Sequence, residues 1–154
     1  MSAADDEATL RTYALTLAAA IEAVLPRWIE RCVARYALLD AALAPAVARA
    51  SADALGEVMP KVRAVLLADV DQQRVNPLAL LRSAVRFPTA VLDELGVRPA
   101  ERDEFARRNF PEDRYDLTPA SFADVDPTLH EPGLVWGAAK AHVVLQRRRG
   151  EGRR

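Results

Sequence analysis

Arginine side chains are the residues of this sequence best suited to binding a charged ligand. Arg82 and Arg86 stand four residues apart in a stretch with helical spacing, and Arg74 precedes Asn76, where that stretch begins. Side chains four residues apart share one face of a helix. Because the free backbone amides of a helix N-terminus attract anions, Arg74, Asn76 and Arg82 could hold a phosphate or a carboxylate.

An alternative explanation is that Arg82 and Arg86 are paired within the protein. Residues 101–131 contain nine acidic and four basic side chains, so this stretch has an excess of negative charge that needs cations nearby. The candidate partners in it are the carboxylates of Asp103, Glu104 and Asp113. We favour these internal ion pairs over an anion site.

A second group of arginines lies near the end of the sequence. Residues 140–154 hold six basic and one acidic side chain, and they include Arg147, Arg148 and Arg149. Such a run can contact the phosphates of a nucleic acid in a salt-dependent way. It contains no aromatic residues on which bases could stack. We therefore favour a solubilising helix end whose charge suits the negative end of the helix dipole.

Candidates for catalysis and metal binding are few. Cys32 is in phase with apolar neighbours, which predicts a core thiol, and Ser83 and Ser121 lack a nucleophile-elbow pattern. A divalent metal could use oxygen ligands beside one imidazole. Residues of these types are Asp124, Asp126, His130 and Glu131. Their spacing matches no known metal motif, and Asp126 is better explained as a cap before Pro127. We predict no catalytic residue, no metal site and no cofactor.

A small-molecule pocket is the remaining possibility for a site. Tyr115, His130 and Trp136 combine aromatic surface with hydrogen-bonding groups, and the first two fall in a proline-rich stretch. His142 has no carboxylate partner in its own helical stretch, so a structural role is favoured over general acid–base catalysis.

The element expected to carry Arg82 and Arg86 is a helical segment over residues 76–97. Asn76 is a typical N-cap, and Pro77 is typical of the first helical position. Pro88 predicts a kink or a restart of the helix. Gly96 followed by Val97 predicts a Schellman end, with Gly96 in the left-handed region. We expect this segment to be central in the fold.

Other helices are expected on both sides of that segment. Apolar spacing predicts helix from residue 2 to about 39, either kinked or divided at Pro26, and another from residue 45 to 71 interrupted by Pro60. A short helix follows from Pro99 to Phe110, and a last one begins at Gly133. Between them lies a proline-rich segment over residues 111–133, which we call the belt. In it, Thr118-Pro119 and Asp126-Pro127 are expected to begin short helices, with Leu117, Phe122, Val125 and Leu129 packed inward.

Composition supports an all-α domain. The chain has 154 residues, 51% of them hydrophobic and 28% charged, with a net charge of −1. No alternating strand pattern occurs. We predict a single compact bundle of five to six helices over residues 1–146, with the belt on one side, and a mobile basic tail over residues 147–154. The acidic N-terminus and the lack of an apolar run of ~18 residues predict a cytoplasmic protein that does not enter the membrane.

Three phrases of the sequence carry a resemblance: QQRVNPLALLRSAVRFPTAVL, FPEDRYDLTPASFADVDPTLHEPG and WGAAKAH. Across about residues 71–142 the chain resembles an uncharacterised family of small proteins from high-GC bacteria. The resemblance implies a cytoplasmic bacterial protein and transfers no activity, cofactor or catalytic residue.

The function favoured by these observations is a non-enzymatic helical interaction or regulatory protein with a protein partner or a homodimeric state. The first alternative is a nucleic-acid-associated protein that uses Arg82, Arg86 and the basic tail. The second is a small-molecule binder or enzyme with a pocket near the belt. Whether the chain is an enzyme stays open, and we favour that it is not.

The tail yields the first testable prediction. Deleting residues 147–154 should leave helicity and melting temperature nearly unchanged, because these residues have no apolar side chain to bury. Circular dichroism of the truncated chain measures both quantities. A loss of helicity on truncation would show that the tail packs on the domain.

Overall fold

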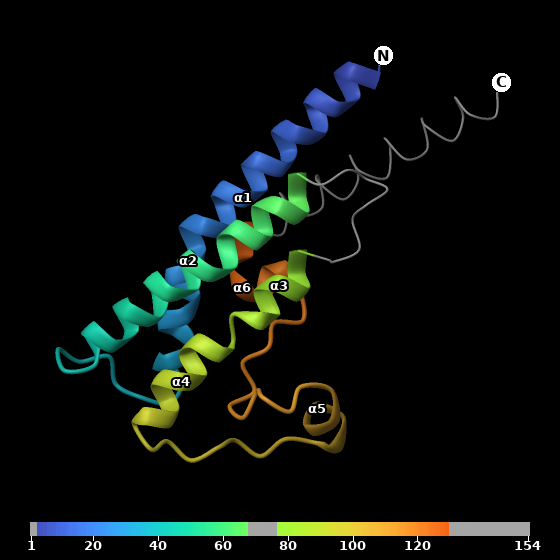
Figure 1. Cartoon of the computed structure of the whole chain (residues 1–154). Helices are drawn as coiled ribbons and strands as arrows, with labels where there is room; N and C mark the ends of the chain where they lie inside the picture. Colours follow the sequence, from blue (N-terminus) through green and yellow to red (C-terminus); the bar gives the residue numbers. More distant parts are fainter. Residues whose placement is uncertain (1–2, 68–76, 130–154) are drawn as a thin grey trace.

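The computed structural model describes residues 3–67 and 77–129 of the chain (Figure 1). Its helices are α1 (Ala3–Ala34), α2 (Ala44–Leu67), α3 (Pro77–Ser83), α4 (Arg86–Glu94), α5 (Glu104–Asn109) and the single turn α6 (Phe122–Val125), followed by the 3-10 helix η1 (Pro127–Leu129). The described residues contain no strand. The predicted all-α class is confirmed, and the helix count agrees with five to six.

The core is built on the antiparallel pair α1 and α2 (Figure 1). In α1, residues such as Leu17, Ile21, Leu25 and Ile29 recur three or four apart and are fully buried. The facing residues of α2 are Val47, Ala50, Ser51, Ala54, Val58, Met59, Val62 and Leu66. On the outer side of this contact, Arg63 of α2 pairs with Glu22 of α1 at 2.9 Å. None of the described helices is long and apolar enough to cross a membrane.

Both long helices continue through a proline. Pro26 lies inside α1, so the single-helix alternative is correct, and Pro60 lies inside α2, so the predicted interruption is wrong. A proline removes the bond to the carbonyl four residues earlier. Those carbonyls belong to Glu22 and Gly56, which are both exposed, so water can replace the lost donor. The packed apolar face keeps each helix in phase across its proline.

The segment expected to be one central helix is two short helices laid on the α1–α2 pair. Pro77 is the first residue of α3, as predicted, while Asn76 lies outside the described residues. The helix is interrupted at Ala84 and Val85, where backbone bonds shorten to three-residue spacing. Pro88 is then the third residue of α4, where an amide has no intrahelical partner anyway. The predicted restart therefore occurs two residues before the proline, and the central position belongs to α1 and α2.

The predicted end of α4 is confirmed. Gly96 has a φ of +70° and donates its amide to Asp93 O at 3.0 Å, and Val97 donates to Leu92 O at 3.1 Å. These two bonds define the Schellman motif. The motif turns the chain away from α4 toward α5.

The region after Gly96 departs from prediction in two places. The expected helix from Pro99 begins only at Glu104, because Asp103 caps it by accepting from the Ala106 amide at 2.8 Å. Thr118-Pro119 starts no helix. Instead, α6 begins after Ser121, whose amide is bound by Asp124 at 3.1 Å.

The belt packs onto the helices as expected. Asp126 accepts from the Thr128 amide at 2.9 Å and caps η1 at Pro127, which confirms that prediction. Leu117, Val125 and Leu129 are buried, and Phe122 packs against the core.

Two glycines give a matched test of where these helices continue and where they end. Gly96→Val should lower the free energy of unfolding by about 1–3 kcal/mol, because a β-branched side chain is strained at positive φ. Gly56→Ala should raise it by about 0.5–1 kcal/mol, since Gly56 sits in the interior of α2 with open space around its Cα. Urea denaturation measures both. Equal stabilities for wild type and the valine variant would contradict the Schellman assignment.

Candidate functional site

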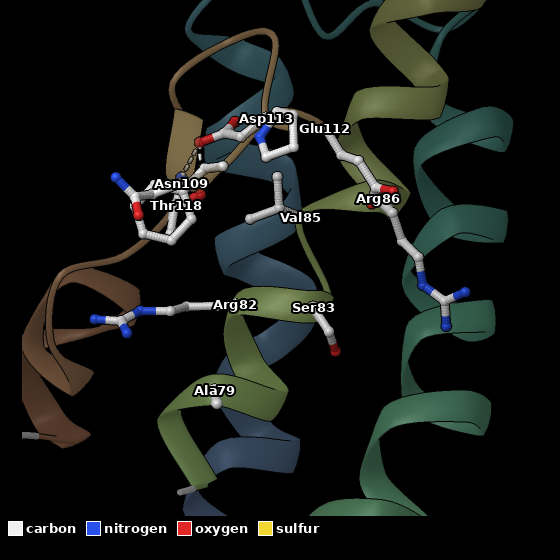
Figure 2. Close-up of a pocket in the computed structure, with 11 residues that line it drawn as sticks. Ala79, Arg82, Ser83, Val85, Arg86, Asn109, Glu112, Asp113 and Thr118 are labelled. Atoms are coloured by element: carbon white, nitrogen blue, oxygen red, sulfur yellow. Dashed lines mark hydrogen bonds between the residues drawn. The ribbon is translucent and has the colours of Figure 1, made fainter. Parts of the chain in front are cut away.

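A cavity of about 270 Å³ separates the α3–α4 junction from the start of the belt (Figure 2). It is the place where the predicted arginine site can be examined, because Arg82 and Arg86 both contribute to its wall. The other residues of the wall are Ala79, Ser83, Val85, Asn109, Phe110, Pro111, Glu112, Asp113 and Thr118.

Arg82 is bound to the belt. Its Nε donates to Pro119 O at 2.9 Å, and its Nη2 donates to Ala120 O at 3.1 Å. A proline-rich segment without regular structure leaves carbonyls that need donors from elsewhere. Arg82 supplies two of them from α3, so its role in this structure is to fasten the belt.

Arg86 points the other way, toward α2 (Figure 2). It forms an ion pair with Glu57 of α2, and its guanidinium carbon lies 4.7 Å from the centre of the Phe87 ring. The ion pair is half exposed on both sides. Arg86 is thus paired internally, as favoured, but with a carboxylate of α2.

The predicted ion pairs of Arg82 and Arg86 with Asp103, Glu104 or Asp113 are wrong. Two structural features explain this. The interruption at Ala84 and Val85 removes the shared helical face, so Arg82 and Arg86 diverge on either side of Val85 (Figure 2). The carboxylates are also otherwise engaged, as the caps and bonds of their own segment show.

Asp113 is the clearest case of such a carboxylate. It is buried, and it accepts from the Leu117 amide at 2.8 Å, the Thr118 amide at 2.8 Å and the Thr118 hydroxyl at 2.6 Å. These bonds close the belt turn on itself. A carboxylate filled in this way has little capacity left for a ligand or an arginine.

The remaining polar groups of the cavity are also mostly used. Ser83 donates to Leu80 O, and Asn109 donates to Phe105 O at 2.9 Å. Only the exposed Glu112 carboxylate has no partner among the described residues that line this cavity. Without a second group to polarise, a lone carboxylate makes no nucleophile–base pair. The described wall therefore suits a structural joint better than a reaction centre.

Tyr115 lies in the core of the belt contact. It is 1% exposed, its hydroxyl donates to Asp93 Oδ1 at 2.8 Å, and its own carbonyl accepts from the Tyr36 hydroxyl at 2.6 Å. Burial and the bond with Asp93 raise the pKa of Tyr115, so the phenol stays neutral. Its predicted partners in a pocket, His130 and Trp136, lie outside the described residues, so that pocket stays a prediction.

Two further arginines bind the belt, Arg31 in the last turn of α1 and Arg35 directly after this helix. Arg31 donates to Val125 O and lies 3.7 Å from Asp126 Oδ2, and Arg35 donates to Asp116 O at 3.0 Å. Asp126 also accepts from Thr128, and this bonding lowers the pKa of its carboxyl. The only sequence signal for this role was a long proline-rich stretch with few internal donors.

The other candidate groups have structural roles where they are described. Burial raises the pKa of the Cys32 thiol to about 12, so the reactive thiolate is scarce at neutral pH. Asp124 and Asp126 serve as caps. Within residues 3–67 and 77–129, no three His, Cys, Asp or Glu side chains converge as a metal site would require.

The other predicted contacts fall outside the described part of the chain. They are Arg74, Asn76, Arg147, Arg148 and Arg149. No protein-family model, curated protein or solved structure matches this chain.

Because Arg82 and Arg86 have different surroundings, replacing each of them should lower the free energy of unfolding by a different amount. Arg82→Gln should lower the free energy of unfolding by about 1–3 kcal/mol, because two belt carbonyls lose a charged donor. Arg86→Gln should cost about 0–1 kcal/mol, because its partner is half exposed. Thermal and urea unfolding of the two single variants make the comparison. Equal losses would refute the belt-fastening role of Arg82.

Proposed function

We propose that this chain is a non-enzymatic helical interaction protein that associates with a second copy of itself. The contact surface is the apolar end, which we define as residues 38–45, at the end of the α1–α2 loop and the start of α2, together with Leu95 directly after α4. The proposal rests on the exposure of apolar side chains at this end.

Residues 38–45, which run from the α1–α2 loop into α2, have the sequence LLDAALAP, in which Asp40 is the one polar residue. Leu38 is 82% exposed and Leu39 is 42% exposed, and most of the alanines around them are also exposed. Loops normally present polar groups to water, and exposed apolar patches tend to mark contact surfaces. This loop is therefore the observation that carries the proposal.

Leu95 extends the same surface. It is 49% exposed, and Figure 1 shows the end of α4 and the α1–α2 loop at the same end of the molecule. Tyr115 ties the two together, because it accepts from Tyr36 just before the loop and its hydroxyl lies 3.0 Å from Val97 O just after α4. These bonds join the segments next to the two parts of the apolar end, which lowers the entropy cost of bringing those parts together for docking.

The apolar end suits a two-fold contact. Exposed Glu94 and Arg98 flank Leu95 with opposite charges. In an isologous interface each charge of one copy can face the opposite charge of the other. Asp40 already accepts a hydrogen bond from the Leu43 amide at 2.9 Å, directly before α2.

The nucleic-acid alternative has less support from the structure than from the sequence alone. Arg82 and Arg86, on which it relied, are bound to belt carbonyls and to Glu57. It now depends on the basic tail, which lies outside the described residues.

Sedimentation velocity of the purified chain tests the proposal. Wild type should shift from monomer toward dimer over about 1–100 µM, as a reversible interface of this kind requires. Leu38→Gln should raise the dissociation constant of the dimer roughly tenfold or more, because the substituted side chain occurs twice in a two-fold interface. The matched control is Phe105→Gln, since Phe105 is 69% exposed but lies on α5, away from the apolar end (Figure 1). A chain that stays monomeric throughout, or equal effects of both variants, would refute the homodimer.

A further inference from the structure

A second hollow, of about 440 Å³, lies beside α5 and is separate from both the cavity and the apolar end described above. Its wall consists of Pro99, Ala100, Glu101, Arg102, Arg107 and Arg114. Residues 101–131 are strongly acidic, yet three of their four basic side chains meet here. Arg102 precedes α5, Arg107 lies on it and Arg114 follows it, so no single helix carries all three and only the fold brings them together.

The backbone that carries these arginines is fixed by hydrogen bonds between segments. The Ala100 amide donates to Arg114 O at 3.0 Å, which joins the stretch after α4 to the belt. Arg102 Nη1 donates to Phe110 O at 2.6 Å across the far end of α5. The Asp103 cap then fixes the start of the helix that carries Arg107. The backbone around the hollow is therefore held in place, and binding would not have to order it first.

The charge of these arginines is only partly compensated. Arg102 bonds a neutral carbonyl, so its charge is unpaired and most of its donors are unused. Arg107 makes no side-chain hydrogen bond or ion pair with the described residues. Arg114 is paired with Asp93, and the only acidic residue of the wall is Glu101. Positive charge is in excess at a point that faces water.

We propose that this hollow binds the dianionic phosphate of a small phosphate monoester that also carries a hydroxyl group. Guanidinium groups match the tetrahedral oxygens of a phosphate and bind it in bidentate fashion. The volume lies in the range of small-ligand sites. This binding does not depend on the self-association proposed above.

The rest of the wall narrows the class of ligand. It contains no aromatic side chain, so a nucleobase would find no ring to stack on. Glu101 repels additional negative charge, which disfavours a polyphosphate or a nucleic-acid backbone, and it can accept a hydrogen bond from a ligand hydroxyl. Pro99 and Ala100 add a short apolar edge suited to a small carbon skeleton.

Isothermal titration calorimetry with three probes tests the proposal on the full chain. The probes are inorganic phosphate, glycerol 3-phosphate and dimethyl phosphate. Glycerol 3-phosphate should bind most tightly, inorganic phosphate should follow, and dimethyl phosphate, a diester with a single charge, should bind roughly tenfold more weakly or not at all. Tighter binding of inorganic phosphate than of glycerol 3-phosphate would contradict the proposal that the ligand has an organic part. Equal binding of the diester would contradict the proposal that the hollow selects a dianion.

Matched variants locate the site. Arg107→Gln should weaken glycerol 3-phosphate binding roughly tenfold, because it removes one charge-assisted contact. It should leave the fold intact, since Arg107 has no side-chain partner among the described residues. The control is Arg108→Gln, because Arg108 is next in the sequence but outside the hollow, where it pairs with Glu104 at 3.1 Å. Equal effects of the two variants, or no binding by wild type, would refute the site.

The pH dependence gives an independent readout. Arginine keeps its charge throughout, so affinity for the monoester should fall as pH drops through the second phosphate pKa of about 6. Dimethyl phosphate has no such ionisation and should show no change. An affinity for the monoester that stays constant from pH 8 to 5 would show that the dianion is not what the hollow selects.

Discussion

Backbone carbonyls of the belt, which neither helix nor strand satisfies, impose the constraint on which the rest of this structure depends. Side chains elsewhere supply the missing donors: Arg31 from the last turn of α1, Arg35 and Tyr36 from the turn directly after it, and Arg82 from α3. A guanidinium group offers several donors in one plane, so it can bond two carbonyls at once, as Arg82 does. Three arginines, Arg31, Arg35 and Arg82, thus serve the main chain of the belt.

The fold could be predicted from the sequence wherever periodic apolar residues or special backbone chemistry dictated it. The buried face of α1, the Schellman end at Gly96 and the cap at Asp126 all follow from local rules. The prolines did not predict where the helices break. Pro60 did not interrupt α2, because tertiary packing outweighs one lost hydrogen bond, and the break before Pro88 fell two residues early.

The sites were predictable to a smaller degree, because a site depends on which segments meet. Arg82 and Arg86 were singled out by spacing that assumed one continuous helix, and the turn between them separates their side chains. Arg102, Arg107 and Arg114 carry no periodic signal and lie within an acidic stretch. The pairing of the Ala100 amide with Arg114 O is the contact that places them together, and no single-sequence rule anticipates such a long-range bond.

The way Asp113 closes the belt has a consequence for how the molecule opens. The Leu117 and Thr118 amides are held by one carboxylate, whereas amides of α1 and α2 are held by a cooperative ladder. Segments held by few bonds open locally without global unfolding. We therefore expect the belt to open as a separate unit, with its amides exchanging with solvent while those of the helix pair remain protected. Its release would uncover the apolar surface now beneath Leu117 and Val125, so the molecule carries a second, concealed apolar surface.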